Sequence, residues 1–153
     1  LALAVLSTRI RNYVITCMMT TFQSLLPAYL DAHSWLLQTP GLWALGDWPE
    51  LTGRSLAQGF LVQYALSDEL FPEEGMRQAH QILESLHGRE SYTGSFWPGD
   101  HVFTAAMQSE AINYLSTTLR AAGSAPDHLS SPTHRHLATE DLDDSATRSH
   151  GTR

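Results

Sequence analysis

Two residues that can perform acid–base chemistry, Asp68 and His101, each follow a predicted β-strand. The carboxylate comes just after the apolar run 59–65, and the imidazole comes just after a weaker strand candidate at 91–97. In open sheets of parallel strands, ligands bind beyond the carboxyl ends of the strands. We therefore expect both side chains at one rim of the sheet. There the carboxylate could orient the imidazole, which could take a proton from a nucleophile.

Each of these residues also has an ordinary structural interpretation. Asp68 stands in the predicted turn 67–69, and Asp is common in turns because its side chain hydrogen-bonds the nearby backbone. His101 could simply precede the helix that follows it. The adjacent Asp100 is interpreted as a turn or cap residue and not as a second acid. Spacing alone leaves both interpretations of Asp68 and His101 open.

The elements that must position these residues alternate between strand and helix. Short β-branched, aromatic or fully apolar runs predict the strands, and apolar residues three to four positions apart predict the later helices. The expected order is helix 1–7, strand 12–17, strand 59–65, helix 72–86, strand 91–97 and helix 104–119, with an aromatic, loop-rich segment at 22–51. This alternation predicts an α/β fold with a parallel sheet of three strands, at least one edge of which is bare. The first strand is expected to be buried on both faces, and the stripes 76–86 and 107–119 are interpreted as core faces.

The segment 22–51 carries side chains that could cover a pocket. Trp35, Trp43 and Trp48 could line such a pocket or could simply pack against the body of the protein. His33 is interpreted as a partly exposed loop histidine.

Residues 124–153 differ in composition from the preceding 123 residues. They contain no aromatic residue and are rich in Ser, Thr, Asp and His, so we expect a disordered tail after a folded part spanning 1–123. His134 and His136 lie in this tail. Zinc sites need three or four ordered ligands, and we therefore predict no metal site there.

The overall composition excludes several classes of protein. Of the 153 residues, 42% are hydrophobic, which is enough for a core, and Cys17 is the only cysteine, which excludes a disulfide framework. All nine basic residues are Arg, none of them clustered, and we expect no nucleic-acid partner. No apolar run reaches the roughly 18 residues of a membrane span. The run 1–6 is too short for a signal peptide and lacks a basic start. Because a targeting signal would precede Leu1, the location is left unknown, with a cytoplasmic one expected over a secreted one.

The loops that carry the two candidate residues also resemble a known family. Tyr64-Ala-Leu-Ser-Asp68-Glu-Leu-Phe-Pro72 and Pro98-Gly-Asp-His101-Val-Phe103 resemble the acid and histidine loops of α/β-hydrolases. The similarity is to bacterial serine esterases of the dienelactone hydrolase and acetyl xylan esterase type. It covers roughly residues 1–122 and includes the stretches 16–20, 33–35, 40–42, 47–49 and 103–108.

This resemblance implies the C-terminal half of an α/β-hydrolase fold. It also implies a small-molecule ester substrate, an acyl-enzyme intermediate and no cofactor or metal. Asp68 would be the triad acid, and His101 would be the general base and then the general acid. Prolyl oligopeptidase-type peptidases share both loops and remain an alternative, which a long upstream propeller domain would favour.

The sequence lacks the nucleophile that this resemblance implies. The family places a serine in Gly-x-Ser-x-Gly on a turn between a strand and a helix, and this sequence has no such motif. The nearest string surrounds Ser55, which precedes a strand and stands only 13 positions before Asp68. Cys17 lies within a predicted strand and is no substitute.

The first residues suggest where the nucleophile belongs. Leu1–Leu6 resemble the end of the helix that follows the nucleophile, so we expect the serine a few residues before Leu1 and no esterase turnover by this chain alone. The alternative is a non-catalytic remnant of a truncated gene, or a fragment that binds a partner through its bare sheet edge. An isolated chain of this kind is expected to aggregate or to remain molten.

Overall fold

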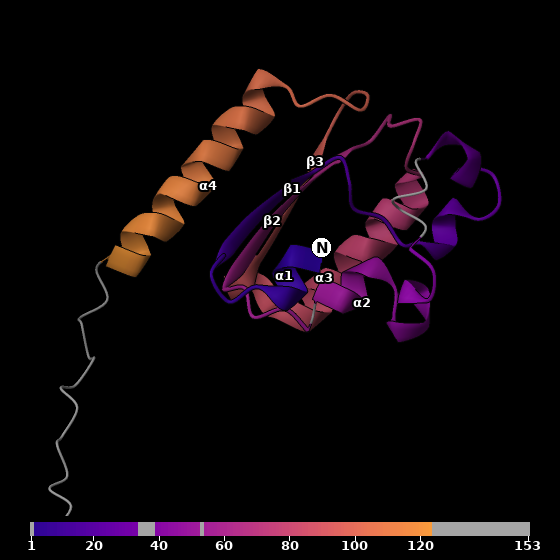
Figure 1. The fold of residues 1–153 in the computed structure, drawn as a ribbon. Coiled ribbons are helices and arrows are strands. Elements are labelled where there is room, and N and C mark those ends of the chain that lie inside the picture. Colours follow the sequence, from indigo (N-terminus) through magenta and orange to yellow (C-terminus); the bar gives the residue numbers. More distant parts are fainter. Residues whose placement is uncertain (1, 34–38, 53, 124–153) are drawn as a thin grey trace, which may run out of the picture.

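The computed structural model describes residues 2–33, 39–52 and 54–123. The predictions that fall on Trp35 and on the tail 124–153, with His134 and His136, lie outside these residues. Within them, the chain forms one sheet with helices on both of its faces (Figure 1).

The sheet has three parallel strands in the order β1-β2-β3. The strands are β1 (Asn12–Thr16), β2 (Gly59–Ala65) and β3 (Tyr92–Trp97). This confirms the predicted α/β class and the three-stranded parallel sheet. Strand β2 is buried at all seven positions because it lies between the other two. The prediction that the first strand is buried on both faces is wrong: β1 is half-buried throughout, because it forms an edge of the sheet among the described residues.

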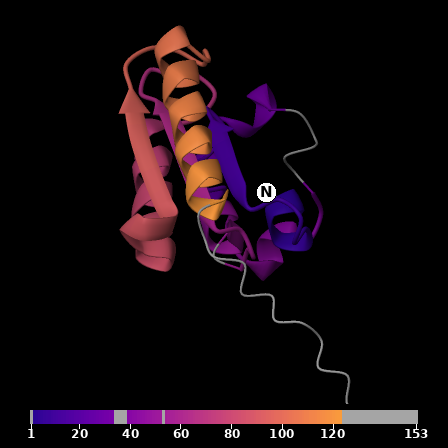
Figure 2. The same cartoon turned by 90° about the vertical axis from the view of Figure 1, so that its left-hand side faces the viewer.

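Helices flank the sheet on both faces. Helices α1 (Ala2–Leu6), α2 (Trp48–Thr52) and α3 (Glu73–Ser91) lie on one face, and α4 (Ala105–Gly123) lies on the other, as the rotated view in Figure 2 shows. Short 3₁₀ turns occupy Gln23–Leu25, Leu30–Ala32 and Leu42–Leu45. The sequence did not predict α2. The pair Asp47 and Glu50, three positions apart, was the available sequence signal, and in the structure the backbone N–H of Asp47 donates to Oε2 of Glu50 at 2.8 Å.

The larger core lies between the sheet and α1–α3. Alternate residues of β2 (Phe60, Val62 and Tyr64) meet the buried face of α3, which consists of Met76, Ala79 and Leu83. Leu86, predicted on the same face, is half exposed near the end of α3, where Gly88 departs from helical geometry with φ of 65°.

The face of the sheet covered by α4 has a much smaller core. Met107 and Ala111 of α4 are buried, but Ile112, Leu115 and Leu119 are exposed. The predicted core face at 107–119 is therefore right at Met107 and Ala111 and wrong at Leu115 and Leu119. Tyr114 is half-buried with its hydroxyl beside Gly59 of β2, whereas Ile112 and Leu115 line an open groove beside β1.

Three hydrogen-bonded side chains link β2, α3 and β3 within the larger core. The hydroxyl groups of Tyr64 and Tyr92 lie 3.0 Å apart, and His80 Nδ1 lies 2.8 Å from the Tyr92 hydroxyl. Burial raises the pKa of Tyr92 to about 12 and also raises the pKa of Tyr64. Both tyrosines therefore keep their protons in the fold at a pH where an unfolded chain would lose them.

This difference predicts a loss of stability in alkali. Unfolded tyrosine ionises near pH 10, whereas Tyr92 does so near 12, so the unfolded state binds fewer protons in this range and folding weakens as the pH rises above 10. The chain has no lysine to obscure the effect. We expect the midpoint of urea unfolding to decrease from pH 9.5 to 11.5, and to decrease less steeply in Tyr92→Phe. An equally steep decrease of the midpoint in Tyr92→Phe and in the wild-type chain would contradict the raised pKa of Tyr92. Tyr29→Phe, which changes a half-buried tyrosine outside this network, is the control.

Candidate active site

Asp68 and His101 meet at the carboxyl end of the sheet, as their positions after β2 and β3 predicted. His101 Nδ1 lies 2.8 Å from Asp68 Oδ2. The side chain of Asp68 is fully enclosed, with 0% exposed, whereas that of His101 is 39% exposed. The pair thus has a shielded carboxylate and an imidazole that opens to solvent.

The loops after β2 and β3 are fixed to each other by their backbones. Leu66 N–H donates to the Trp97 carbonyl, and Ser67 N–H donates to the Gly99 carbonyl, each at 2.9 Å. Gly99 has φ of 112°, a conformation that favours glycine. These contacts hold the loop of His101 against the turn of Asp68.

Both interpretations of Asp68 apply at once, because its two carboxylate oxygens have different partners. Oδ1 accepts the backbone N–H of Leu70 at 2.9 Å, which is the turn role, and Oδ2 faces His101. The carboxylate is therefore fixed in place before it contacts the imidazole.

The ring of His101 is oriented by two contacts. Its plane stacks on the buried ring of Phe71, with centroids 5.9 Å apart and planes inclined by 20°. An ionised carboxylate can only accept a hydrogen bond, so Nδ1 carries the proton and Nε2 of the neutral ring keeps its lone pair. Within residues 2–33, 39–52 and 54–123, Nε2 has no hydrogen-bond partner and is free to take a proton.

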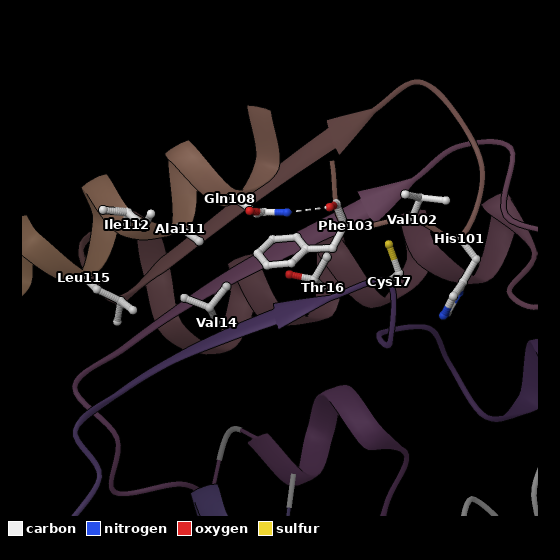
Figure 3. Close-up of a pocket in the computed structure, with 10 residues that line it drawn as sticks. All are labelled: Val14, Thr16, Cys17, His101, Val102, Phe103, Gln108, Ala111, Ile112 and Leu115. Carbon is white, nitrogen blue, oxygen red and sulfur yellow. Dashed lines mark hydrogen bonds between the residues drawn. The ribbon is translucent and has the colours of Figure 1, made fainter. Parts of the chain in front are cut away.

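An open groove of about 720 Å³ runs from this pair along β1 and α4 (Figure 3). His101 and Cys17 lie at one end, and Leu115 lies at the other. The walls between them are mainly apolar and include Val14, Ala111 and Ile112. Among the described residues that line the groove, His101 is the one with a basic side chain, and it lies at the end of the groove.

Cys17 lies beside the candidate pair at the end of β1, with a left-handed backbone (φ 53°). Burial and, secondarily, the charge of Asp68 raise the pKa of its thiol, although the backbone of Val102 acts in the other direction. The thiol is therefore protonated at neutral pH and is not an activated nucleophile.

The other candidates have structural partners. The hydroxyl of Ser55 donates to the Ala4 carbonyl at 2.5 Å, before the start of β2 and thus at the opposite end of the sheet from His101. His33 Nε2 lies 2.8 Å from the Leu70 carbonyl. Trp48 is buried in the core, whereas Trp43 is exposed beside a second groove.

Asp100 is exposed, and its carbonyl accepts the Val102 N–H at 2.7 Å, which agrees with its interpretation as a turn residue.

Comparisons with known proteins do not assign this chain to a family. No family model, curated protein or solved structure matches it. Among the described residues, no group of three His, Cys, Asp or Glu side chains could hold a metal ion. No helix in that part of the chain is long and apolar enough to cross a membrane.

Two features of this region were missed from the sequence. Phe71 belongs to the quoted loop, but nothing in its position showed that it would stack on His101. Glu110 stands between Met107 and Ala111 on the stripe interpreted as apolar. A carboxylate at that position was the available signal that α4 contacts the sheet through polar groups.

Proposed function

We propose that this chain supplies the acid and the histidine of a serine hydrolase acting on carboxylic esters. The observation that carries the proposal is the contact of an enclosed carboxylate with Nδ1 of an exposed imidazole whose Nε2 has no partner among the described residues. The chain order, acid before histidine, and their places after neighbouring parallel strands agree with the α/β-hydrolase arrangement. The fold implied is the C-terminal half of that domain.

In this proposal the two residues move one proton. His101 Nε2 takes the hydroxyl proton of the attacking serine and later gives it to the leaving alcohol, and Asp68 stabilises the charged imidazolium. The serine oxygen forms a bond to the ester carbonyl carbon, and the alcohol leaves to give an acyl-enzyme. Water then releases the acid by the same proton transfers.

The free edge of β1 indicates the side from which a nucleophile would reach His101. Just outside the two ends of β1, Cys17 N–H donates to the Gln63 carbonyl and the Arg11 carbonyl accepts the Gly59 N–H. Backbone groups alternate in direction along a strand, so the odd-numbered residues of β1 form the hydrogen bonds to β2. The backbone groups of Val14 and Thr16 therefore point away from β2 and could pair with a further strand. The carboxyl end of a strand parallel to β1 would lie at the same rim as His101. The proposal places the nucleophile there, outside residues 1–153.

The test begins with the coding DNA upstream of Leu1. An in-frame Gly-x-Ser-x-Gly within about twenty residues would provide the expected serine on a strand-to-helix turn. The protein extended to include its upstream domain should hydrolyse p-nitrophenyl acetate and should react with a fluorophosphonate at that serine. Residues 1–153 alone should show no hydrolysis above buffer.

The controls use two histidines that contact the same aromatic ring. His101→Ala should abolish hydrolysis by the extended protein, whereas His33→Ala should retain it, because His33 also packs on Phe71 but does not contact Asp68. Hydrolysis by residues 1–153 that disappears in His101→Ala would show that the nucleophile lies within the chain. A stop codon upstream, or an extended protein without turnover, would favour the non-catalytic alternative.

A further inference from the structure

Helix α4 follows the loop of His101 and has few apolar contacts with the sheet. Met107 and Ala111 are its buried apolar side chains among the described residues, and both belong to its first two turns. Leu115 and Leu119 are exposed. The position of α4, and with it the end of the histidine loop, must therefore depend strongly on polar contacts.

These contacts converge on one carboxylate oxygen, Oε2 of Glu110. It accepts hydrogen bonds from Gln63 Nε2 at 2.6 Å, from Ser95 Oγ at 2.8 Å and from Trp97 Nε1 at 3.2 Å. The three donors come from β2 and β3. Glu110 thus ties the second turn of α4 to two strands at once.

Gln63 extends the connection to the first turn of α4 and to β1. Its side chain is 0% exposed. Its Nε2 also donates to the Met107 carbonyl at 2.8 Å, and its Oε1 accepts the hydroxyl of Thr16 at 2.7 Å. One set of hydrogen bonds therefore spans all three strands and α4.

The loop carrying His101 joins two elements that this set ties together, β3 and α4. Its first end leaves β3 at Trp97, a donor to Glu110. Its last end enters α4, where the Gln108 side chain donates to the Phe103 carbonyl at 2.9 Å (Figure 3). The separation between Trp97 and the first turns of α4 sets the span that the loop must cross, and so sets where His101 lies.

We propose that Glu110 is a positioning residue for His101, acting through α4 and the loop 98–104. A catalytic role for this positioning rests on the proposed function. The effect of Glu110 on the contact between His101 and Asp68 can be measured without turnover. Removing the carboxylate takes away the acceptor that the three donors share, so that Trp97 Nε1 keeps only Ser95 Oγ at 3.1 Å and Gln63 Nε2 keeps only the Met107 carbonyl. One of them, the amide of Gln63, is fully buried, and such a loss is costly. The first turns of α4 should then shift, and the contact between His101 and Asp68 should loosen.

The experiment measures the tautomer of His101 by long-range proton–nitrogen NMR on the extended protein, with the signal assigned by its absence in His101→Ala. In the wild-type chain, Asp68 holds the proton on Nδ1, and the neutral ring should be mainly this tautomer. In Glu110→Ala we expect the Nε2–H tautomer to become the major form. Glu110→Gln should restore the wild-type pattern, because its amide oxygen can accept the same three donors.

Ser109→Ala, on the exposed side of the same helix, is the matched control and should leave the tautomer unchanged. If Glu110→Ala does not fold, Ser95→Ala combined with Trp97→Phe removes two of the three donors and should give a smaller shift in the same direction. A folded Glu110→Ala or double variant with the wild-type tautomer would overturn the inference. A tautomer change in a protein whose extended form has no esterase activity would support positioning and reject the proposed function.

Discussion

Replacing Asp68 by Asn in the extended enzyme should lower kcat by roughly 10⁴-fold, the loss typical when a triad acid becomes an amide. The substitution changes one contact and keeps the other, because the two oxygens of Asp68 have different partners. Asn keeps an oxygen for the backbone N–H of Leu70, so the turn after β2 should persist. Its amide NH₂ replaces Oδ2 and can only donate. It therefore favours a His101 ring with the proton on Nε2, which cannot accept the serine proton.

The measurement is steady-state hydrolysis of p-nitrophenyl acetate with purified protein, together with a thermal melt. KM should change far less than kcat, since Asp68 is enclosed and does not contact the solvent side of His101. Asp100→Asn is the control: it makes the same chemical change one residue before His101, on an exposed side chain. An Asp68→Asn enzyme within tenfold of the wild-type kcat would remove Asp68 from the mechanism.

The positions of the strands could be predicted because the sequence signals there are local. The run 59–65 is apolar except at Gln63, which is typical of a central strand, and it forms β2 at those bounds. The meeting of Asp68 and His101 followed from topology alone. Parallel neighbouring strands end at one rim, so residues just past their ends lie close together.

What could not be predicted depends on neighbours that the local pattern does not specify. The run 12–17 reads as a strand covered on both faces, yet whether anything covers β1 is decided by the arrangement of other elements. The stripe 107–119 has helical spacing along its whole length, but Leu115 faces an open groove beside β1 and Leu119 is exposed. The Glu110 contacts depend on the register of β3 relative to β2, which sets Ser95 beside Gln63.

The second large effect concerns stability and is expected at Phe60. Its side chain is 0% exposed and stacks on Tyr13, with ring centroids 5.6 Å apart, and it also packs against His87 at 5.0 Å. Phe60→Ala should lower the free energy of unfolding by about 3–5 kcal/mol, because the lost burial is added to the cost of the cavity left behind. Urea unfolding followed by tryptophan fluorescence measures this loss.

Phe103→Ala makes the same chemical change where the ring is 45% exposed, and it should cost much less. Equal losses in the two variants would mean that Phe60 is not packed as described. Phe60→Ala should also lower stability without changing the candidate catalytic pair. It lies at the start of β2, whereas Asp68 follows the end of that strand, so the lost ring should leave the Asp68–His101 contact intact in molecules that remain folded. The Phe60→Ala chain should therefore unfold at lower urea while its His101 tautomer stays as in the wild-type chain, the reverse of the pattern expected for Asp68→Asn.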